Sequence, residues 1–320
     1  MRLGIIGTGI VAAEHLEAAR AVAGVRVTAV CDIRADSTRA IAAAAGAAAY
    51  ADHRAMLARE RLDAVVVTAP HALHARLTLD AAAAGVHVLV EKPMATTVAD
   101  CTAMIEACAA AGVVLAVGHV VRFDPVAHRA AEALRSGTVG DVLAISHRRT
   151  SHYRRGSRPG WFFDPAMAGG GIVMNVGIHG LDRIQWLGGG SVVAATGRVW
   201  RRDGHAVETD AMGTVELDSG VPASFLLTSA VPAYLDETVV VCERGSLRWS
   251  AADGAVLSRD DGTETPLATG PAGPAAAFAA QLADFAAACR DRRAPAVGGD
   301  YGRGVVETVH AIYAAAGSLA

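Results

Sequence analysis

A glycine-rich turn near the start of the chain is the first segment whose residue types and spacing can do chemistry. It follows an apolar run and reads GTGIVA from Gly7 to Ala12, which fits the pattern G-x-G-x-x-G/A. Gly7 permits a tight turn, Gly9 lets the backbone approach a pyrophosphate, and Ala12 keeps the next helix close to the strand. The N-terminus of that helix offers N–H groups to phosphates. The pattern predicts a dinucleotide site with these contacts: Gly7, Thr8, Gly9 and Ile10.

A carboxylate ends the next apolar run, at the distance that this kind of site requires. Asp32 falls 20 residues after Ala12, where an acidic residue bonds the ribose hydroxyls of the adenosine half. Its charge would repel a 2′-phosphate, so Asp32 favours NAD. Arg34 leaves NADP open, because an arginine two residues further on could lie over the adenine or reach a 2′-phosphate. A solvated loop arginine is the other interpretation of Arg34.

Polar residues also follow the next two apolar runs, in the segments 68–74 (TAPHALH) and 89–93 (LVEKP). The carboxyl ends of parallel strands meet at one edge of a sheet, and ligands bind beyond that edge. Pro93 would end its strand and could carry a cis peptide bond. His71 and His74 have the spacing of a metal pair, but no third ligand is in sight, so we expect polar contacts at a helix start and no metal. The residues expected on the same rim as the glycine-rich turn are Thr68, Ala69, Pro70, His74, Glu91 and Lys92.

The elements that must position this rim alternate over the first 120 residues. Short apolar runs predict strands at 3–6, 26–31, 64–68, 86–90 and 114–117. Alanine-rich stretches predict helices near 10–22, 36–45, 53–59, 72–84 and 97–111. Continuous apolar strands between helices indicate a parallel sheet covered on both faces. The fold class is therefore α/β, with a doubly wound dinucleotide-binding domain over 1–120.

The pattern changes after about residue 120, and the rest of the chain, 121–320, is expected to form a second domain. A helix is expected at 125–136, and further helices at about 275–290 and 301–317. Strands are expected at 141–150, 191–200, 207–217, 222–230, 236–242 and 245–249. Consecutive strands with turn signals between them indicate an antiparallel sheet. The segment 251–274, rich in Ala, Gly, Pro and Asp, is expected to be irregular or mobile.

Composition bounds the class of protein. The chain has 320 residues, 52% hydrophobic and 19% charged, with a net charge of −3. These apolar residues are enough to form two cores. The slightly negative net charge and the lack of a basic block argue against nucleic acid or an anionic membrane as a partner. The five cysteines form no C-x-x-C pair, and Cys101 and Cys108 are expected in a helix core. With no charged leader and no long apolar window, these features predict the cytoplasm.

A second polar constellation stands in the segment 169–182, GGGIVMNVGIHGLD. Asn175 and His179 are four residues apart, so a helix would place them on one face. A lone helical histidine is usually structural. This one follows a glycine-rich entry and has a polar neighbour on its face, and an imidazole has the right pKa range for moving a hydroxyl proton near neutral pH.

The order of these motifs resembles the glucose–fructose oxidoreductase / inositol dehydrogenase / rhizopine catabolism (Gfo/Idh/MocA) family. The shared series is G-x-G-x-x-G/A, an acidic residue after the second strand, T-x-P-x-x-x-H, E-K-P, and G-x-H-x-x-D. It continues with RFDP at 122–125 and GTVGD at 137–141, so it covers almost the whole chain. The resemblance implies a Rossmann domain and an α/β domain with a large open, mainly antiparallel sheet, whose C-terminal helix could pack back on the first domain. An uncovered sheet face usually needs a partner, and the family forms dimers and tetramers, so we expect a homodimer or homotetramer.

The resemblance also implies roles for individual residues. Lys92 would face the substrate beside the nicotinamide and bond the reacting oxygen, and a structural ion pair with Glu91 is the alternative. His179 would take the hydroxyl proton, and hydride would pass from carbon to the nicotinamide. Asn175 departs from the aspartate of many members: it can orient His179 but cannot stabilise an imidazolium by charge. This departure puts the substrate class and the pH optimum in doubt.

Four more polar or aromatic residues are expected to line the cleft: Arg122, His152, Tyr153 and Trp161. Of these, Arg122 is expected at the cofactor, and the region of Trp161 closes over the cofactor in similar proteins. Ordinary packing is the alternative for Tyr153 and Trp161. The implied activity is an NAD(P)-dependent oxidoreductase acting on a secondary alcohol or ketone of a sugar, sugar derivative or cyclitol. Two other functions remain open: an NAD-dependent glycosidase working through a transient keto intermediate, and a non-catalytic nucleotide sensor.

Overall fold

A computed structural model describes residues 1–153, 156–202, 204–229, 234–250, 252–269 and 274–317. Position 230 of the expected strand 222–230, and 251 and 270–273 of the expected irregular segment, lie outside the described residues. Contacts divide the chain into two compact units, one made of 1–123 and 274–303, the other of 124–269 and 304–317. The expected domains, 1–120 and 121–320, stay a prediction about folding units.

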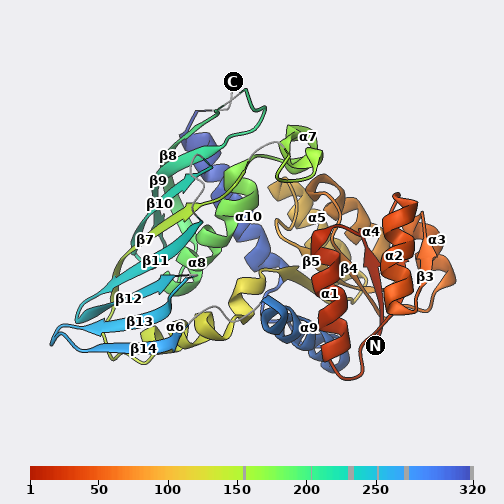
Figure 1. The fold of residues 1–320 in the computed structure, drawn as a ribbon, viewed down its shortest axis with the longest axis horizontal. Coiled ribbons are helices and arrows are strands. Elements are labelled where there is room, and N and C mark those ends of the chain that lie inside the picture. Colours follow the sequence, from red (N-terminus) through yellow and green to blue (C-terminus); the bar gives the residue numbers. More distant parts are fainter. Residues whose placement is uncertain (154–155, 203, 230–233, 251, 270–273, 318–320) are drawn as a thin grey trace. The chain divides into compact units, whose positions relative to one another are not determined.

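The first unit contains a six-stranded parallel sheet in the order β3-β2-β1-β4-β5-β6 (Figure 1). Its strands are β1 (Arg2–Ile6), β2 (Arg26–Cys31), β3 (Ala48–Tyr50), β4 (Ala64–Val67), β5 (His87–Glu91) and β6 (Leu115–Gly118). Its helices are α1 (Ile10–Ala21), α2 (Ala35–Ala45), α3 (His53–Arg59), η1 (His71–Leu73), α4 (His74–Ala83), α5 (Val98–Ala110), η2 (Val120–Phe123) and α9 (Pro274–Asp291). This order is that of a doubly wound dinucleotide-binding fold, which confirms the expected α/β class.

The parallel strands form because apolar residues occupy both of their faces. β4 reads AVVV, and all four of its residues are fully buried. Helices α1 and α9 pack against each other. The core beneath them joins Leu3 and Val66 of the sheet to Phe278 and Phe285 of α9. The sheet therefore takes part of its cover from a helix far along the chain. The sequence did not predict β3, because its residues AAY follow directly on an alanine-rich helix signal.

The second unit contains an eight-stranded sheet in the order β14-β13-β12-β11-β7-β10-β9-β8 (Figure 1). Its strands are β7 (Val142–Thr150), β8 (Val192–Trp200), β9 (Asp210–Leu217), β10 (Pro222–Thr228), β11 (Leu235–Cys242), β12 (Gly245–Ser250), β13 (Gly254–Arg259) and β14 (Glu264–Thr269). Its helices are α6 (Pro125–Arg135), η3 (Gly160–Phe163), α7 (Pro165–Ala168), the π-helical turn η4 (Val173–Gly177) and α8 (Ile178–Gly188). Helix α10 (Gly299–Ala315) has residues in both units.

The sheet is mainly antiparallel, which confirms the expectation, and two of its features were not predicted from the sequence. Strand β7 inserts between the consecutive strands β10 and β11 and pairs in parallel with β10, so the sheet is antiparallel except at that pair. The segment expected to be irregular holds β13 and β14, which pair with each other and with β12. The cross-strand partners supply the order that its Gly- and Pro-rich composition does not predict, because strand formation depends strongly on tertiary context.

The two faces of the eight-stranded sheet have different surroundings. Helices α6 and α8 contact one face (Figure 1). On the other face the alternating residues are exposed, and several of them are large and apolar: Leu143, Val193, Met212, Leu226 and Val241. Among the described residues, no helix is long and apolar enough to span a bilayer. The five cysteines are all free, and Cys101 and Cys108 are buried as expected.

Candidate active site

The glycine-rich turn of the first unit has room for glycine alone at its first position. Gly7 has φ of +102°, a conformation that L side chains rarely adopt. A Cβ atom there would lie 2.7 Å from the carbonyl carbon of Thr68. The Gly7 N–H donates to the Cys31 carbonyl at 2.8 Å, and the Thr68 hydroxyl donates to the Gly7 carbonyl at 2.8 Å. The turn is thereby clamped between the ends of β2 and β4.

The start of α1 fits a pyrophosphate. Gly9 is its N-cap, no side chain caps it, and its first turn holds no acidic residue. A Cβ on Gly9 would meet nothing closer than 4.0 Å, so the space in front of the helix is open. Ile10, the first helical residue, is 79% exposed. N–H groups at an uncapped helix N-terminus attract anions, and an exposed apolar neighbour suits a ligand that covers it.

Asp32 lies beside this turn, and its carboxylate is already engaged. One oxygen accepts the Thr8 N–H at 2.7 Å, and the other accepts the Arg34 N–H at 2.8 Å. The Arg34 guanidinium bonds both oxygens, at 3.1 and 3.0 Å. Burial alone would raise the pKa of Asp32, but the bonds from Arg34 and Thr8 bring it down to about 2. Ser37, which the sequence did not single out, shares a hydrogen bond of 2.6 Å with the Thr8 hydroxyl.

His74 joins the two rim segments that follow β4 and β5. Its Nε2 lies 2.8 Å from the Ala69 carbonyl oxygen, and its Nδ1 lies 2.9 Å from that of Pro93. The ring is 1% exposed. Burial lowers the pKa of His74, while the two carbonyl contacts act against that shift. The sequence predicted a cofactor contact, and the structure gives this side chain backbone partners between the two loops.

Lys92 follows β5 and precedes a cis peptide bond to Pro93, as the sequence allowed. The neighbouring Glu91 is buried, and its carboxylate bonds His15 Nε2 at 2.8 Å and accepts the Lys92 backbone N–H at 3.2 Å. Burial raises the pKa of Glu91, but His15 and the charge of Lys92 together hold it below its usual value. Glu91 thus braces the loop from inside, with His15 of α1 as a partner that the sequence did not indicate.

Arg122, at the end of the rim in η2, stacks on an aromatic ring. Its guanidinium carbon lies 3.7 Å from the centre of the Tyr301 ring, within the range of a cation–π contact. His119, directly after β6, meets the same ring edge-on, with centroids 5.9 Å apart. These three side chains form one cluster in the first unit.

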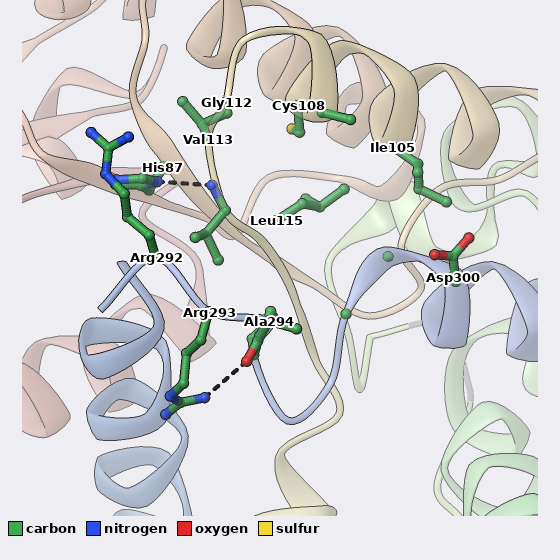
Figure 2. A pocket seen from close by; sticks show the side chains of 15 residues that line it. His87, Ile105, Cys108, Gly112, Val113, Leu115, Arg292, Arg293, Ala294 and Asp300 are labelled. Atoms are coloured by element: carbon green, nitrogen blue, oxygen red, sulfur yellow. Dashed lines mark hydrogen bonds between the residues drawn. The ribbon is translucent and has the colours of Figure 1, made fainter. Parts of the chain in front are cut away.

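A cavity of about 530 Å³ lies where the parallel strands β5 and β6 begin, away from their carboxyl ends (Figure 2). His87 and Leu115, which line it, are the first residues of β5 and β6, whereas Glu91 ends β5. The His87 Nδ1 accepts the Val114 N–H at 2.8 Å, and Arg293 donates to the Ala294 carbonyl (Figure 2). The cavity is therefore separate from the rim that carries Lys92.

In the second unit a buried carboxylate holds the start of the segment that carries Asn175 and His179. Glu208 accepts the N–H of Gly171 at 2.8 Å and that of Val173 at 3.1 Å with its side chain, and the N–H of Ile172 at 2.9 Å with its carbonyl. Three successive amides thus end on one residue, which is 0% exposed. Nothing in the sequence around Glu208 indicates this role, because the partners are separated by more than thirty positions.

Tyr313 of α10 completes this arrangement, and the glycines make room for it. Its hydroxyl donates to Glu208 at 2.6 Å. A Cβ on Gly170 would lie 2.2 Å from the Tyr313 hydroxyl, and one on Gly171 would lie 2.0 Å from the Glu208 carbonyl oxygen. Burial raises the pKa of Glu208, and the bonds from Tyr313 and the two amides oppose that shift. Positions 170 and 171 must therefore be glycine, because Tyr313 and Glu208 approach the backbone there too closely for a side chain.

Asn175 and His179 stand on different kinds of helix. Asn175 is buried in the π-helical turn η4, and the half-buried His179 is the second residue of α8. π-helical turns are rare and occur frequently at functional sites. The sequence predicted a helical segment here but did not predict that its first turn is π-helical.

Tyr153 lies next to Asn175. It is fully buried, and its hydroxyl donates to the Phe162 carbonyl at 2.7 Å. Burial and then the charge of Glu208 raise the pKa of Tyr153, while a hydrogen bond with the Asn175 side chain lowers it. Trp161 is half-buried and stacks on Phe162, with ring centroids 3.8 Å apart. Of the residues expected to line the cleft in this unit, only His152 is exposed.

Helix α8 is fixed to the sheet by charges that the sequence did not single out. The buried Arg183 donates to Asp236 on β11 at 2.9 Å and lies 3.7 Å above the Trp249 ring. The buried His147 lies against Gly180, where a Cβ would come within 2.2 Å of the ring. These contacts set the rotation of the helix that carries His179.

Two family models match the chain. "Oxidoreductase family, NAD-binding Rossmann fold" (GFO_IDH_MocA) matches residues 1–119, and "GFO/IDH/MocA C-terminal domain" matches residues 127–248. Together they span both the rim with Lys92 and the segment with Asn175 and His179.

Individual proteins are similar over much of the chain. An inositol 2-dehydrogenase of Saccharopolyspora erythraea is 36% identical over 64% of this chain, and the chain covers 59% of that relative's length. A D-apiose dehydrogenase of Paraburkholderia graminis is 33% identical over 83% of this chain and 72% of its own length. The solved aldose–aldose oxidoreductase of Caulobacter crescentus is 27% identical, with a TM-score of 0.89 over 99% of this chain and 97% of that one.

Proposed function

Because the chain belongs to the Gfo/Idh/MocA oxidoreductase family, we propose that it transfers hydride between a nicotinamide cofactor and a small polyol. The substrate class is a sugar, sugar derivative or cyclitol with a secondary alcohol or the matching ketone. Relatives named as inositol, apiose and D-xylose dehydrogenases support this class. When bound, the nicotinamide supplies the hydride acceptor or donor.

The observation that carries the proposal is the residue type at position 92. Lys92 is the only lysine among the 29 lysines and arginines of the chain. An ammonium is a compact point charge that can donate to one developing alkoxide, whereas a guanidinium is a planar fork suited to bidentate acceptors. All the remaining lysine or arginine positions of the chain are arginine, and the one amine side chain stands directly after β5. We take this as support for a chemical role of Lys92.

In the oxidative direction, His179 takes the hydroxyl proton, and Lys92 donates a hydrogen bond to the same oxygen as negative charge develops on it. The imidazolium then releases its proton to water. Asn175 orients the site by hydrogen bonding and brings no charge, so the imidazolium of His179 is less favoured than it would be beside an aspartate. Glu208 holds the segment in which both residues lie.

NAD is the preferred cofactor, held by Gly7, Thr8, Gly9 and Ile10, with Asp32 bonding the adenosine ribose. Arg34 weakens the discrimination against NADP, because its guanidinium neutralises Asp32 and is itself 58% exposed. The remaining rim contacts are proposed as Thr68, Ala69, Pro70, His74, Glu91 and Arg122. His152 and Trp161 are proposed as substrate contacts, with Tyr153 beside Asn175.

The exposed face of the eight-stranded sheet is proposed as a subunit interface. Met212 and Leu226 are direct cross-strand partners on this face, and both are largely exposed. Apolar side chains gathered on an open sheet are typical of a surface that a partner covers. A homodimer or homotetramer is therefore proposed, in the reducing environment of the cytoplasm that five free cysteines suit.

The proposal is tested with a panel of neutral and charged sugars and cyclitols, each with NAD or NADP, by following the absorbance of the reduced cofactor. Steady formation of reduced cofactor with at least one polyol is expected. Glycoside cleavage with no net cofactor reduction would instead identify a glycosidase. Nucleotide binding without turnover of any compound in the panel would instead indicate a non-catalytic nucleotide sensor.

A further inference from the structure

Arg158, in the loop between β7 and η3, has an unusual environment for an arginine. It is partly buried, and its guanidinium carbon lies 5.4 Å from the centre of the Tyr153 ring and 5.4 Å from that of the Phe162 ring. Both distances are within the range of a cation–π contact. The aromatic rings restrict the guanidinium without neutralising it.

Arg158 has no acidic partner anywhere in the described part of the chain. Its single hydrogen bond is a long one of 3.4 Å to the Ser151 hydroxyl, and its Nε is buried with no partner among the described residues. Arg149, which is also partly buried, and the buried Arg183 both pair with Asp236. Burying an unpaired charge is costly, so buried guanidiniums are normally matched by carboxylates.

The electrostatics agree with this geometry. Burial lowers the pKa of Arg158, the phenolic oxygen of Tyr153 opposes that shift, and the charge of Arg149 adds to it. An arginine stays protonated under all ordinary conditions. Its charge therefore persists, and an anion that entered the loop would find a partly desolvated donor.

Arg158 is close to the proposed substrate site. The Tyr153 hydroxyl, which lies beside Arg158, donates to the Phe162 carbonyl and is hydrogen-bonded with the Asn175 side chain. One aromatic side chain therefore separates the unpaired guanidinium from Asn175. A substrate group a few ångströms from the reacting carbon could reach Arg158 in this unit.

We propose that Arg158 binds an anionic group of the substrate, so that the substrate is a sugar carrying a carboxylate or a phosphate. This rests on the proposed polyol oxidoreductase function and narrows its substrate class. Guanidinium binds carboxylate and phosphate through paired N–H donors, which is the interaction that Arg158 lacks within the chain.

The experiment compares three compounds that differ at one carbon: a hexose, its uronate and its 6-phosphate, in the gluco, galacto and manno series. Oxidation rates are measured with NAD and NADP, and binding is measured separately from the shift in unfolding temperature. The expected result is a preference for a uronate or a hexose 6-phosphate over the neutral hexose. The responding compound identifies whether a carboxylate or a phosphate is bound.

The variant Arg158→Met should reduce this preference by about 10- to 100-fold, the effect of losing a charge-assisted hydrogen-bonded pair. Arg158→Lys should reduce the preference for the anionic sugar less, because it keeps the positive charge. If Arg158→Met does not fold, Arg158→Lys takes its place in the test. Arg135→Met, at an exposed position of α6, removes the same charge elsewhere in the unit and should change nothing.

The outcomes separate this proposal from the function on which it rests. If neutral hexoses are oxidised at least as fast as their uronates and 6-phosphates, and Arg158→Met does not change the ratio of these rates, the anion site is overturned and the oxidoreductase is left intact. Binding of anionic sugars that depends on Arg158, without oxidation of any compound, supports the anion site and contradicts the oxidoreductase. If neither binding nor rate depends on Arg158, its role is limited to packing against Tyr153 and Phe162.

Discussion

Replacing Glu208 with glutamine tests how the segment of Asn175 and His179 is held. The carboxylate accepts three donors: two backbone amides at 2.8 and 3.1 Å and the Tyr313 hydroxyl at 2.6 Å. Glutamine offers one acceptor oxygen and an NH₂ group that must face at least one of these donors. One donor is then left buried and facing the NH₂ group, which costs about 1–3 kcal/mol, and the weakening of the remaining hydrogen bonds adds to this cost.

The expected result is local. Glu208→Gln should lower the free energy of unfolding by about 2–4 kcal/mol. Amide hydrogen exchange at 171–173 should become roughly 10- to 100-fold faster, since about 1.4 kcal/mol corresponds to a factor of ten. Tyr313→Phe should have a smaller effect, because it removes one donor and leaves the amide bonds. Turnover should fall while cofactor affinity is kept, because the glycine-rich turn belongs to the other unit.

Exchange measured by mass spectrometry, with denaturant unfolding of each variant, distinguishes these effects. Glu132→Gln, at an exposed position of α6, is the matched control and should leave exchange and stability unchanged. The reasoning is refuted if Glu208→Gln is folded, exchanges at 171–173 at the wild-type rate and retains full stability.

Three further results are expected. Asp32→Ala should weaken NAD binding and narrow the gap between NAD and NADP, whereas Arg34→Ala should widen it; a wild-type preference for NADP of tenfold or more in binding titrations would make Arg34 the dominant residue. Met212→Glu combined with Leu226→Glu should yield monomers in sedimentation at micromolar concentration, and a monomeric wild type would contradict the interface. The arginine partners of Asp236 outweigh its burial and lower its pKa, so its stabilisation is present above about pH 4 and lost on acidification. Asp236→Asn should therefore flatten the fall in unfolding free energy between about pH 5 and pH 2, and an unchanged slope would exclude this carboxylate as its cause.

Much of the first unit could be predicted because its signals are local. Short continuous runs rich in β-branched residues, such as AVVV at 64–67, favour a buried strand, and the glycine-rich turn and Asp32 lie at fixed distances from a strand end. The missed strand at 48–50 has three residues and no β-branched side chain. The strands at 254–259 and 264–269 were missed because their order comes from neighbours in the sheet.

The sequence could predict which residues of the candidate site follow the end of a strand, but not how their side chains are directed. Sequence position placed His74 on the rim but did not give the direction of its ring, which faces two backbone carbonyls. Glu208 and Arg158 could not be found, because their roles depend on which residues meet them across long separations in the chain. A buried carboxylate that accepts two amides and a tyrosine hydroxyl, and a guanidinium without an acidic partner among the described residues, leave no local pattern in the sequence.

The proposed chemistry of Lys92 and His179 is tested most directly by a double-mutant cycle on turnover. Lys92→Ala and His179→Ala should each lower the rate by about 10²–10⁴-fold while NAD binding is unchanged. Lys92→Arg should restore little, because a guanidinium does not replace an ammonium at one oxygen. The double variant should lose much less than the product of the two single losses, as expected for groups that act as a unit. Full turnover in either alanine variant, or losses that multiply, would contradict the account.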